Sequence, residues 1–326
     1  MLRVASFRYP IMMFLLISFS FTWLFWFGSL LFQDDWAIRK IITGMGFGPA
    51  IAAIAFSLLR GGRCISNSRK WWYWFSLSFI ALMISYLSML VTGDGITASD
   101  FRLAQPLDLT VLNIALCVIS SAIGAFIIAA TFGAQTPVFN GYISLKKAKR
   151  WLLVALFLPA VWLLFGFFIA NIQHKEISDV LGGLDAVTWF LYVARSVMFT
   201  LLVVAIGEEL GWRGWLLPAL QERFSPLLSS IAIGVIWGLW HFPLYLNGGY
   251  SEPPYMVFAK VGVCIFLSII FTYLHNRSSG NVLVAIFLHT ALNSSQRFIP
   301  VTEEMGLLMM LTILILPRLD KMWRRK

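Results

Sequence analysis

The sequence carries little charge for its length. Only 12% of its 326 residues are Asp, Glu, Lys or Arg, whereas soluble globular proteins contain about 25%. A soluble domain of this size could not cover its surface with so few charged side chains. The low charge excludes an ordinary cytosolic enzyme, and a hydrophobic content of 59% excludes a disordered protein.

Cysteine and histidine are scarce as well. The three cysteines, Cys64, Cys117 and Cys264, lie far apart, and no CxxC pair occurs. This spacing excludes a disulfide-stapled secreted domain and indicates no zinc cluster of cysteines. The chain has four histidines, so any chemistry that uses imidazole must rely on very few positions.

What the sequence has in abundance is long apolar runs. The mean hydropathy is +0.81, and about ten segments approach the roughly 20 apolar residues that a transmembrane helix needs. We expect spans at residues 11–32, 41–59, 71–91, 109–132, 151–172, 189–217, 227–246, 255–274, 282–299 and 305–319. The predicted fold class is an all-α, polytopic transmembrane helix bundle of eight to ten spans, with a polar catalytic cavity between the later helices.

The net charge of +10 is explained by membrane topology and not by nucleic acid, because the cations cluster in alternate loops. These clusters are Arg3 and Arg8, then Arg60, Arg63, Arg69 and Lys70, then Lys146, Lys147, Lys149 and Arg150, then Arg277, and finally the residues from Arg318 to Lys326. The intervening loops are mostly acidic or balanced. By the positive-inside rule we expect both termini in the cytoplasm. The protein would lie in the cell membrane of a bacterium or the endoplasmic reticulum of a eukaryote, with the lipid bilayer as a partner.

Three regions are predicted along the chain. Residues 1–180 form the N-terminal transmembrane helices, residues 181–300 a catalytic transmembrane core, and residues 301–326 the last span with a basic cytoplasmic tail. Ionisable residues inside the bilayer are costly and usually functional, and they concentrate in the middle region.

The first such group lies in an otherwise apolar helix. Glu209 and Arg213 are four residues apart, so they share a helix face and can form an ion pair. Glu208 points about 100° away and is left without that partner. A carboxylate in this position is able to act as a general base. The simpler alternative is that all three charges lie at the edge of the membrane.

Two later spans add polar residues at helical spacing. Trp237 and His241 share one face, and so do His289 and Asn293. Two histidines, a glutamate and an asparagine in three separate spans favour one shared active site. Polar packing between helices is the alternative.

Read in order, EExxxR at Glu208, WxxxH at Trp237 and HxxxN at His289 resemble the CPBP family, in which the pattern is EExxxR, FxxxH and HxxxN. This family contains the type II CAAX prenyl endopeptidases and bacteriocin-processing or immunity proteins. The resemblance covers about residues 190–300, and Trp237 replaces a phenylalanine.

The resemblance implies an intramembrane glutamic endopeptidase. Glu208 would activate water and His241 would help to hold it. His289 and Asn293 would stabilise the oxyanion, and Glu209, Arg213 and Trp237 would support them. No cofactor is then required. The competing possibility is a zinc site formed by Glu208, His241 and His289, although HExxH is absent.

For Glu208 and His241 to meet, the sixth span must continue to about residues 217–220; a re-entrant segment is the alternative. Arg195 is then expected to snorkel to the outer interface, and Lys260 is expected to snorkel similarly and to need no function.

The leading functional hypothesis is cleavage of a peptide or membrane-protein substrate, which would be a CAAX sequence where proteins are prenylated. A non-proteolytic immunity or binding protein is the alternative. A transporter is a third possibility, and no internal repeat supports it.

Overall fold

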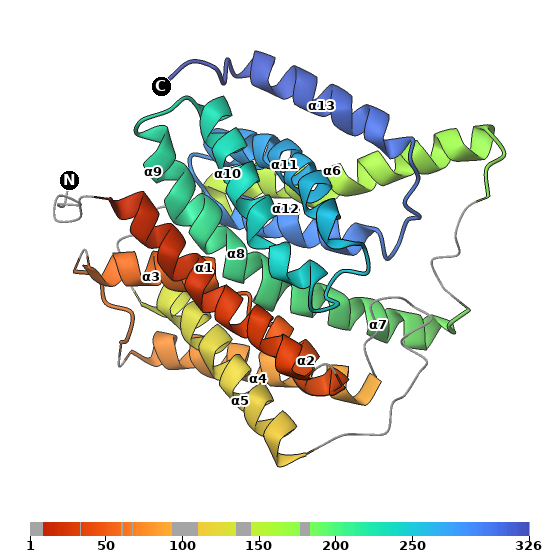
Figure 1. Cartoon of the computed structure of the whole chain (residues 1–326). Helices are drawn as coiled ribbons and strands as arrows, with labels where there is room; N and C mark the ends of the chain where they lie inside the picture. Colours follow the sequence, from red (N-terminus) through yellow and green to blue (C-terminus); the bar gives the residue numbers. More distant parts are fainter. Residues whose placement is uncertain are drawn as a thin grey trace.

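The computed structural model describes residues 9–32, 34–59, 61–66, 68–92, 110–134, 145–176 and 183–325, without the side chains of residues 91, 92 and 145–147. All regular structure in these ranges is helical (Figure 1), as expected for an all-α bundle. Several of the cations used for the topology prediction lie outside the described part: Arg3, Arg8, Arg60 and Lys326, together with the side chains of Lys146 and Lys147.

Each of the ten predicted spans corresponds to helical structure. The first six helices are α1 (Pro10–Gly28) with η1 (Ser29–Phe32), α2 (Trp36–Thr43), α3 (Gly48–Leu59), α4 (Arg69–Thr92), α5 (Val111–Ile128) with η3 (Ala129–Gly133), and α6 (Leu145–Ile172). One long helical segment follows and consists of α7 (Ala186–Phe199), η4 (Thr200–Ala205), α8 (Ile206–Gly211), η5 (Trp212–Leu216) and α9 (Leu217–Gln221). The last helices are α10 (Pro226–Trp240) with η6 (Phe242–Tyr245), η7 (Pro254–Met256) with α11 (Val257–Arg277), α12 (Val282–Ser295) and α13 (Met305–Leu319).

Fewer than ten of these are long enough to cross a membrane on their own. Within the described ranges, seven helices meet that test by length and composition, or eight if the bent pair α2 and α3 forms one span. These two helices meet at an angle of 40°. The helices α12 and α13 have 14 and 15 residues, and at 1.5 Å per residue they reach only about 21–23 Å of a hydrocarbon layer about 30 Å thick. The protein is therefore a multi-pass membrane protein with two short apolar helices.

Side-chain caps set where several helices begin. The side chains of Asp35, Thr110, Asp185, Ser225 and Asn281 accept hydrogen bonds from backbone N–H groups in the first turns of α2, α5, α7, α10 and α12. Each such cap satisfies a donor that the helix itself cannot. The polar residues between the apolar runs thus fix the helix ends.

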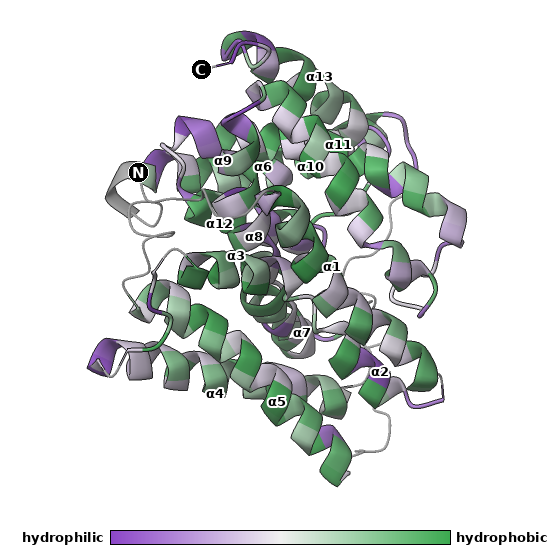
Figure 2. Ribbon diagram, turned by 60° about the vertical axis from the view of Figure 1, so that its left-hand side comes forward, coloured by the Kyte–Doolittle hydropathy of each residue, from purple (hydrophilic) through white to green (hydrophobic). Residues whose placement is uncertain are grey.

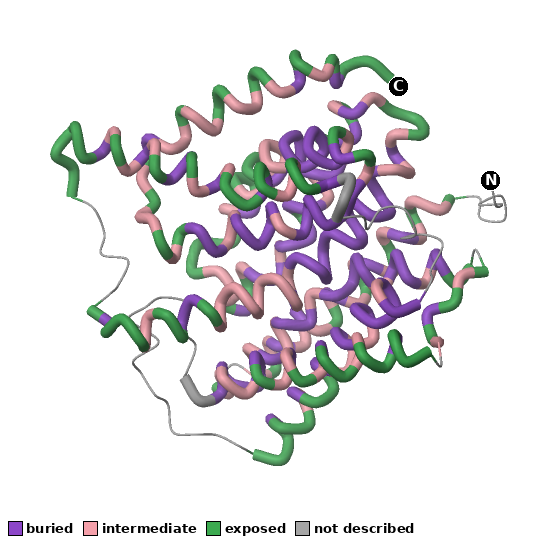
Figure 3. The backbone as a smooth tube through the Cα atoms, turned by 180° about the vertical axis from the view of Figure 1, so that it is seen from behind, coloured by how far each residue is buried: buried purple, intermediate pink, exposed green. Residues whose placement is uncertain are grey.

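The interior is formed by the middle helices. Figure 3 shows buried backbone concentrated at the centre of the bundle and exposed or half-buried residues along α13. Figure 2 shows mainly hydrophobic residues along α4 and α5. Large apolar side chains such as Leu24, Phe157 and Phe258 are exposed, which is typical of a surface that faces lipid.

Glycines let the central helices approach closely. A Cβ atom on Gly211 of α8 would lie 2.4 Å from the Cβ of Pro49 in α3, and one on Gly234 of α10 would lie 2.2 Å from the Cα of Ile265 in α11. These contacts place α3 and α11 directly against the helices that carry the sequence motifs. The region boundaries expected near residues 180 and 300 stay a prediction.

Candidate active site

The EExxxR motif lies in the middle of one long helical segment. The segment runs from Ala186 to Gln221, so the helix extends through residues 217–220 as required for Glu208 to meet His241. Two π-helical stretches, η4 and η5, flank the short α8 that carries both glutamates. Such insertions widen the helix and often occur at functional sites.

Glu209 and Arg213 form the ion pair predicted from their spacing. Arg213 Nη1 lies 3.0 Å and 2.9 Å from the two carboxylate oxygens of Glu209, and both side chains are fully buried. Arg213 also donates to Ser268 Oγ at 3.0 Å, and its guanidinium lies 4.0 Å from the ring centroid of Phe271. Each buried charge thus lies beside an opposite charge and is hydrogen-bonded, and the guanidinium also faces an aromatic ring. These are the conditions under which the burial of charge is tolerated.

His289 is connected to this pair. Its Nδ1 lies 2.8 Å from Glu209 Oε1. A carboxylate can only accept, so Nδ1 carries the hydrogen and Nε2 is left for another partner. The supporting role predicted for Glu209 therefore has a geometric basis, because this carboxylate holds both Arg213 and the imidazole in place.

Glu208 lies on a different face, as the helix geometry requires. Its side chain is 4% exposed and makes no ion pair within the described residues. It accepts a hydrogen bond from Trp237 Nε1 at 2.5 Å. Phenylalanine, the residue of the family pattern, could not make this bond. Trp237 therefore contributes a donor as well as aromatic packing.

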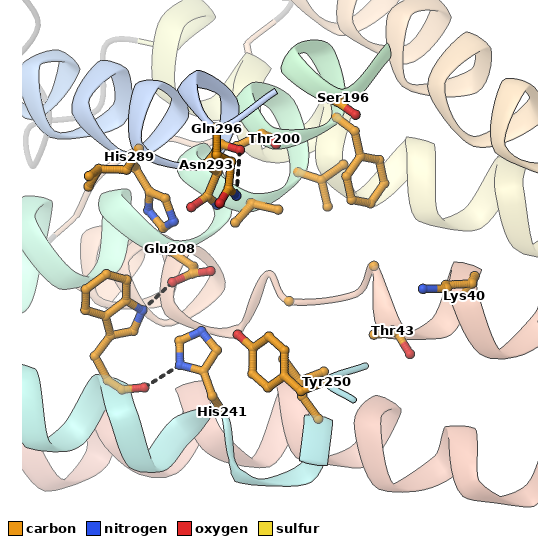
Figure 4. Close-up of a pocket in the computed structure, with 18 of the residues that line it drawn as sticks. Lys40, Thr43, Ser196, Thr200, Glu208, His241, Tyr250, His289, Asn293 and Gln296 are labelled. Carbon is orange, nitrogen blue, oxygen red and sulfur yellow. Dashed lines mark hydrogen bonds between the residues drawn. The ribbon is translucent and has the colours of Figure 1, made fainter. Parts of the chain in front are cut away.

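His241 is oriented from its own helix. Its Nδ1 lies 2.7 Å from the backbone oxygen of Trp237. Since a carbonyl oxygen accepts, Nδ1 carries the hydrogen, and Nε2 of the neutral ring is a free acceptor. Trp237 thus bonds to both Glu208 and His241 and fixes their relative position (Figure 4).

One cavity of about 490 Å³ joins these groups. Glu208, His241, His289 and Asn293 all line it, from α8, the end of α10, and α12 (Figure 4). The four predicted catalytic residues are therefore brought together, while Glu209 and Arg213 lie behind them. The individual roles assigned to these residues stay predictions.

Other lining residues could not be found from the motifs. Tyr250 lies beside His241, with ring centroids 6.1 Å apart, and Lys260 Nζ lies 4.8 Å from the Tyr250 ring centroid. Lys40, Arg195 and Arg297 line the cavity too. The expectation that Lys260 merely snorkels is wrong, because its ammonium group turns inward onto Tyr250. The sequence signal that could have indicated a role for Lys260 is its position inside an apolar run, where a cation is costly.

The residues fit a metal ion poorly. No three His, Cys, Asp or Glu side chains in the described ranges are arranged to hold one. Glu208 instead accepts a hydrogen bond from the indole of Trp237. The set of Glu208, His241 and His289 is thus not a preformed metal centre in this geometry.

Fold and site together define a polytopic membrane protein with a buried acid–base cavity. Residues 186–295 match the family model described as type II CAAX prenyl endopeptidase Rce1-like. The CAAX prenyl protease 2 of Methanococcus maripaludis is 33% identical over 180 residues, which are 51% of this chain and 62% of the relative. The chain thus covers less than two thirds of that relative's length. These matches confirm the resemblance to the CPBP and CAAX-protease family, since all three motifs lie within residues 186–295.

Proposed function

We propose that this protein is an intramembrane endopeptidase that hydrolyses a peptide bond with a water activated by Glu208. The observation that supports it most directly is the convergence of Glu208, His241, His289 and Asn293 on one buried cavity. The name of the related CAAX prenyl protease 2 points in the same direction.

In the proposed reaction a water molecule lies between Glu208 and the free Nε2 of His241. Glu208 takes one proton as the water oxygen attacks the carbonyl carbon of the scissile bond. The same proton then passes to the leaving amine as the C–N bond breaks. Trp237 holds the carboxylate and the imidazole at a fixed separation, so the water is oriented before attack.

Asn293 and His289 are the proposed partners of the developing oxyanion. The side-chain amide of Asn293 is a donor in its ordinary state. His289 donates through Nε2 only when that atom also carries a proton. The carboxylate of Glu209, bonded to Nδ1, fixes the orientation of the ring. Donors fixed in a low-dielectric cavity are worth more than donors in water.

The substrate is a peptide or a segment of a membrane protein, which would include a CAAX sequence in an organism that prenylates proteins. We propose a metal-free reaction, and no step requires a cofactor. We also propose that both termini are cytoplasmic, because the basic clusters lie in alternate loops.

The experiment compares peptides in membranes from cells that express wild type, Glu208→Ala or His289→Ala. A product that appears only with wild type is the expected result. Equal processing by variants that remain folded would contradict the proposal. Protection against a toxin without cleavage would instead favour an immunity protein. If a chelator inactivates the protein and only zinc restores activity, the reaction requires a metal ion and the metal-free proposal is wrong.

A further inference from the structure

Lys260 is a charged side chain in an apolar part of the bundle. It lies near the start of α11, is half-buried and makes no ion pair within the described residues. Its ammonium nitrogen lies 4.8 Å from the ring centroid of Tyr250. The aromatic face attracts the cation, but it supplies no counter-charge. Because an ammonium group has three N–H donors, Lys260 can still bind an anionic acceptor.

Tyr250 is held in place by the loop that carries it. The buried side-chain amide of Asn247 donates to the backbone oxygen of Trp26 at 3.1 Å and to Ser29 Oγ at 2.8 Å. The backbone N–H of Tyr250 donates to the Leu244 carbonyl at 2.9 Å. The loop is therefore tied to α1, η1 and η6, so the position of Tyr250 is part of the fold.

The Tyr250 hydroxyl faces the catalytic residues. The ring centroids of Tyr250 and His241 lie 6.1 Å apart, and Figure 4 shows the hydroxyl pointing toward His241. Tyr250 lies between two spans, and burial raises the pKa of its phenol to about 12, so the hydroxyl keeps its hydrogen at neutral pH. Lys260 and Tyr250 thus place an ammonium and a hydroxyl donor beside the proposed position of the water.

The lining of the cavity is mainly positive. Glu208 is the one acid among the described lining residues, whereas the cations there are Lys40, Arg195, Lys260 and Arg297. A cavity with low-dielectric walls and charges of mostly one sign concentrates ligands of the opposite sign. The described lining therefore favours an anionic group on the substrate, and Lys260 adjoins the catalytic residues through Tyr250.

From this placement we propose that Lys260 and Tyr250 form a subsite that binds a carboxylate of the peptide substrate close to the scissile bond. The two oxygens of a carboxylate can accept from the ammonium and the hydroxyl together, and a bond between two charged groups is stronger than one between neutral groups. An extended peptide advances about 3.3–3.6 Å per residue, so the carboxylate lies within a few residues of the bond that is cut. This inference rests on the proposed endopeptidase function. The carboxylate is either the free C-terminus of the substrate or an acidic side chain.

The test measures the binding of three acetylated tripeptides: Leu-Leu-Leu as the free acid, Leu-Leu-Leu as the C-terminal amide, and Leu-Glu-Leu as the C-terminal amide. Titration calorimetry uses the Glu208→Gln protein in nanodiscs of uncharged lipid, so that no probe is cleaved. We expect at least one carboxylate peptide to bind at least about tenfold more tightly than the neutral amide. The probe that shows the preference identifies the source of the carboxylate.

Further substitutions in the same protein assign the preference to the subsite. Lys260→Met should abolish it, Lys260→Arg should retain it, and Tyr250→Phe should reduce it by a smaller factor because only the hydroxyl is lost. Lys149→Met, at an exposed lysine outside the cavity lining, is the matched control and should leave it unchanged. If Lys260→Met does not fold, Lys260→Gln provides the same comparison.

The proposal is overturned if no carboxylate peptide is preferred, which includes the absence of any binding, or if the preference persists in folded Lys260→Met. An unchanged preference in Tyr250→Phe would remove the hydroxyl from the subsite. These measurements need no turnover. A wild type that cleaves nothing but keeps a preference dependent on Lys260 would contradict the endopeptidase function alone, and a cleaving protein without the preference would contradict the subsite alone.

Discussion

The helices before and after residue 186 bury different kinds of polar group. In the described part of α1 to α6, buried polar side chains are Ser, Thr and Asn, as with Thr131, whose hydroxyl donates to the Ile127 carbonyl at 2.7 Å. In α7 to α12 the interior contains Glu208, Glu209 and Arg213. Hydroxyls satisfied within their own helix cost little, whereas buried charges need a network from several helices. The first part supplies a packing surface and the second part the chemistry.

The largest effect on stability is expected when one charge of the buried pair is removed. Arg213→Met leaves Glu209 buried without its cation, and breaking such a pair costs about 3–5 kcal/mol. Thr131→Val is the matched change in the first part, where a local hydrogen bond is worth about 1 kcal/mol. Unfolding in detergent measures both. Equal losses would remove the contrast between the two parts.

The double variant Glu209→Leu and Arg213→Met sharpens this result. Since the variant leaves no unpaired charge, we expect it to be more stable than Arg213→Met alone. A double variant that is less stable than either single one would show that the pair itself, and not the uncompensated charge, determines the loss.

The next effect concerns the contact between the two parts. Gly211→Ala brings a Cβ within 2.4 Å of Pro49 Cβ, and overpacking of this kind costs about 1–3 kcal/mol. Gly262→Ala is the control, because nothing lies within 4 Å of its Cβ position. Unfolding temperatures should fall for Gly211→Ala and stay or rise for Gly262→Ala. A fall of equal size in both would mean that α3 and α8 do not depend on close contact.

A smaller effect is expected on activity from Trp237→Phe. The change restores the residue of the family pattern and removes the N–H donor to Glu208 while keeping an aromatic ring. Hydrogen bonds to charged groups contribute about 1.5–3 kcal/mol, so a cleavage rate lower by at least about tenfold is expected. Trp212→Phe, a buried indole outside the cavity lining, is the control. An unchanged rate for Trp237→Phe would show that the indole N–H is not needed for cleavage.

The smallest effect is expected on the pH dependence of stability, from an ion pair in the segments that follow α6 and precede α13. Lys175, after α6, pairs with Glu304, before α13, and this hydrogen bond lowers the pKa of Glu304 below its ordinary value of 4.5. A depressed carboxyl pKa contributes stability that is present above the ordinary value and is lost as pH falls through the folded value. Wild type should therefore lose slightly more stability below about pH 4.5 than Glu304→Gln. Identical pH profiles would show that this pair is not coupled to folding.

Much of this fold could be predicted from the sequence, because apolar length is a local property. Ten helical segments and the pairing of Glu209 with Arg213 follow from hydropathy and from spacing on one helix. The break between α2 and α3 depends on local turns and on packing, which the apolar runs do not specify.

The site was predictable only where its residues share motifs. Glu208, His241, His289 and Asn293 are rare polar residues in apolar spans, so their cost made them visible. Tyr250 lies in a loop and Lys40 in a distant helix, so their approach to the cavity depends on tertiary structure. The bond from Trp237 to Glu208 likewise required two helices to be placed in space.

The most direct test of the central claim is Glu208→Gln in purified protein reconstituted in lipid vesicles, assayed with a peptide identified from wild-type membranes. The glutamine oxygen can still accept from Trp237, so the fold should persist while the base is lost. We predict a cleavage rate at least about hundredfold lower, an unchanged unfolding temperature, and full activity for the exposed control Glu222→Gln. A folded Glu208→Gln protein that cleaves at the wild-type rate would contradict the account.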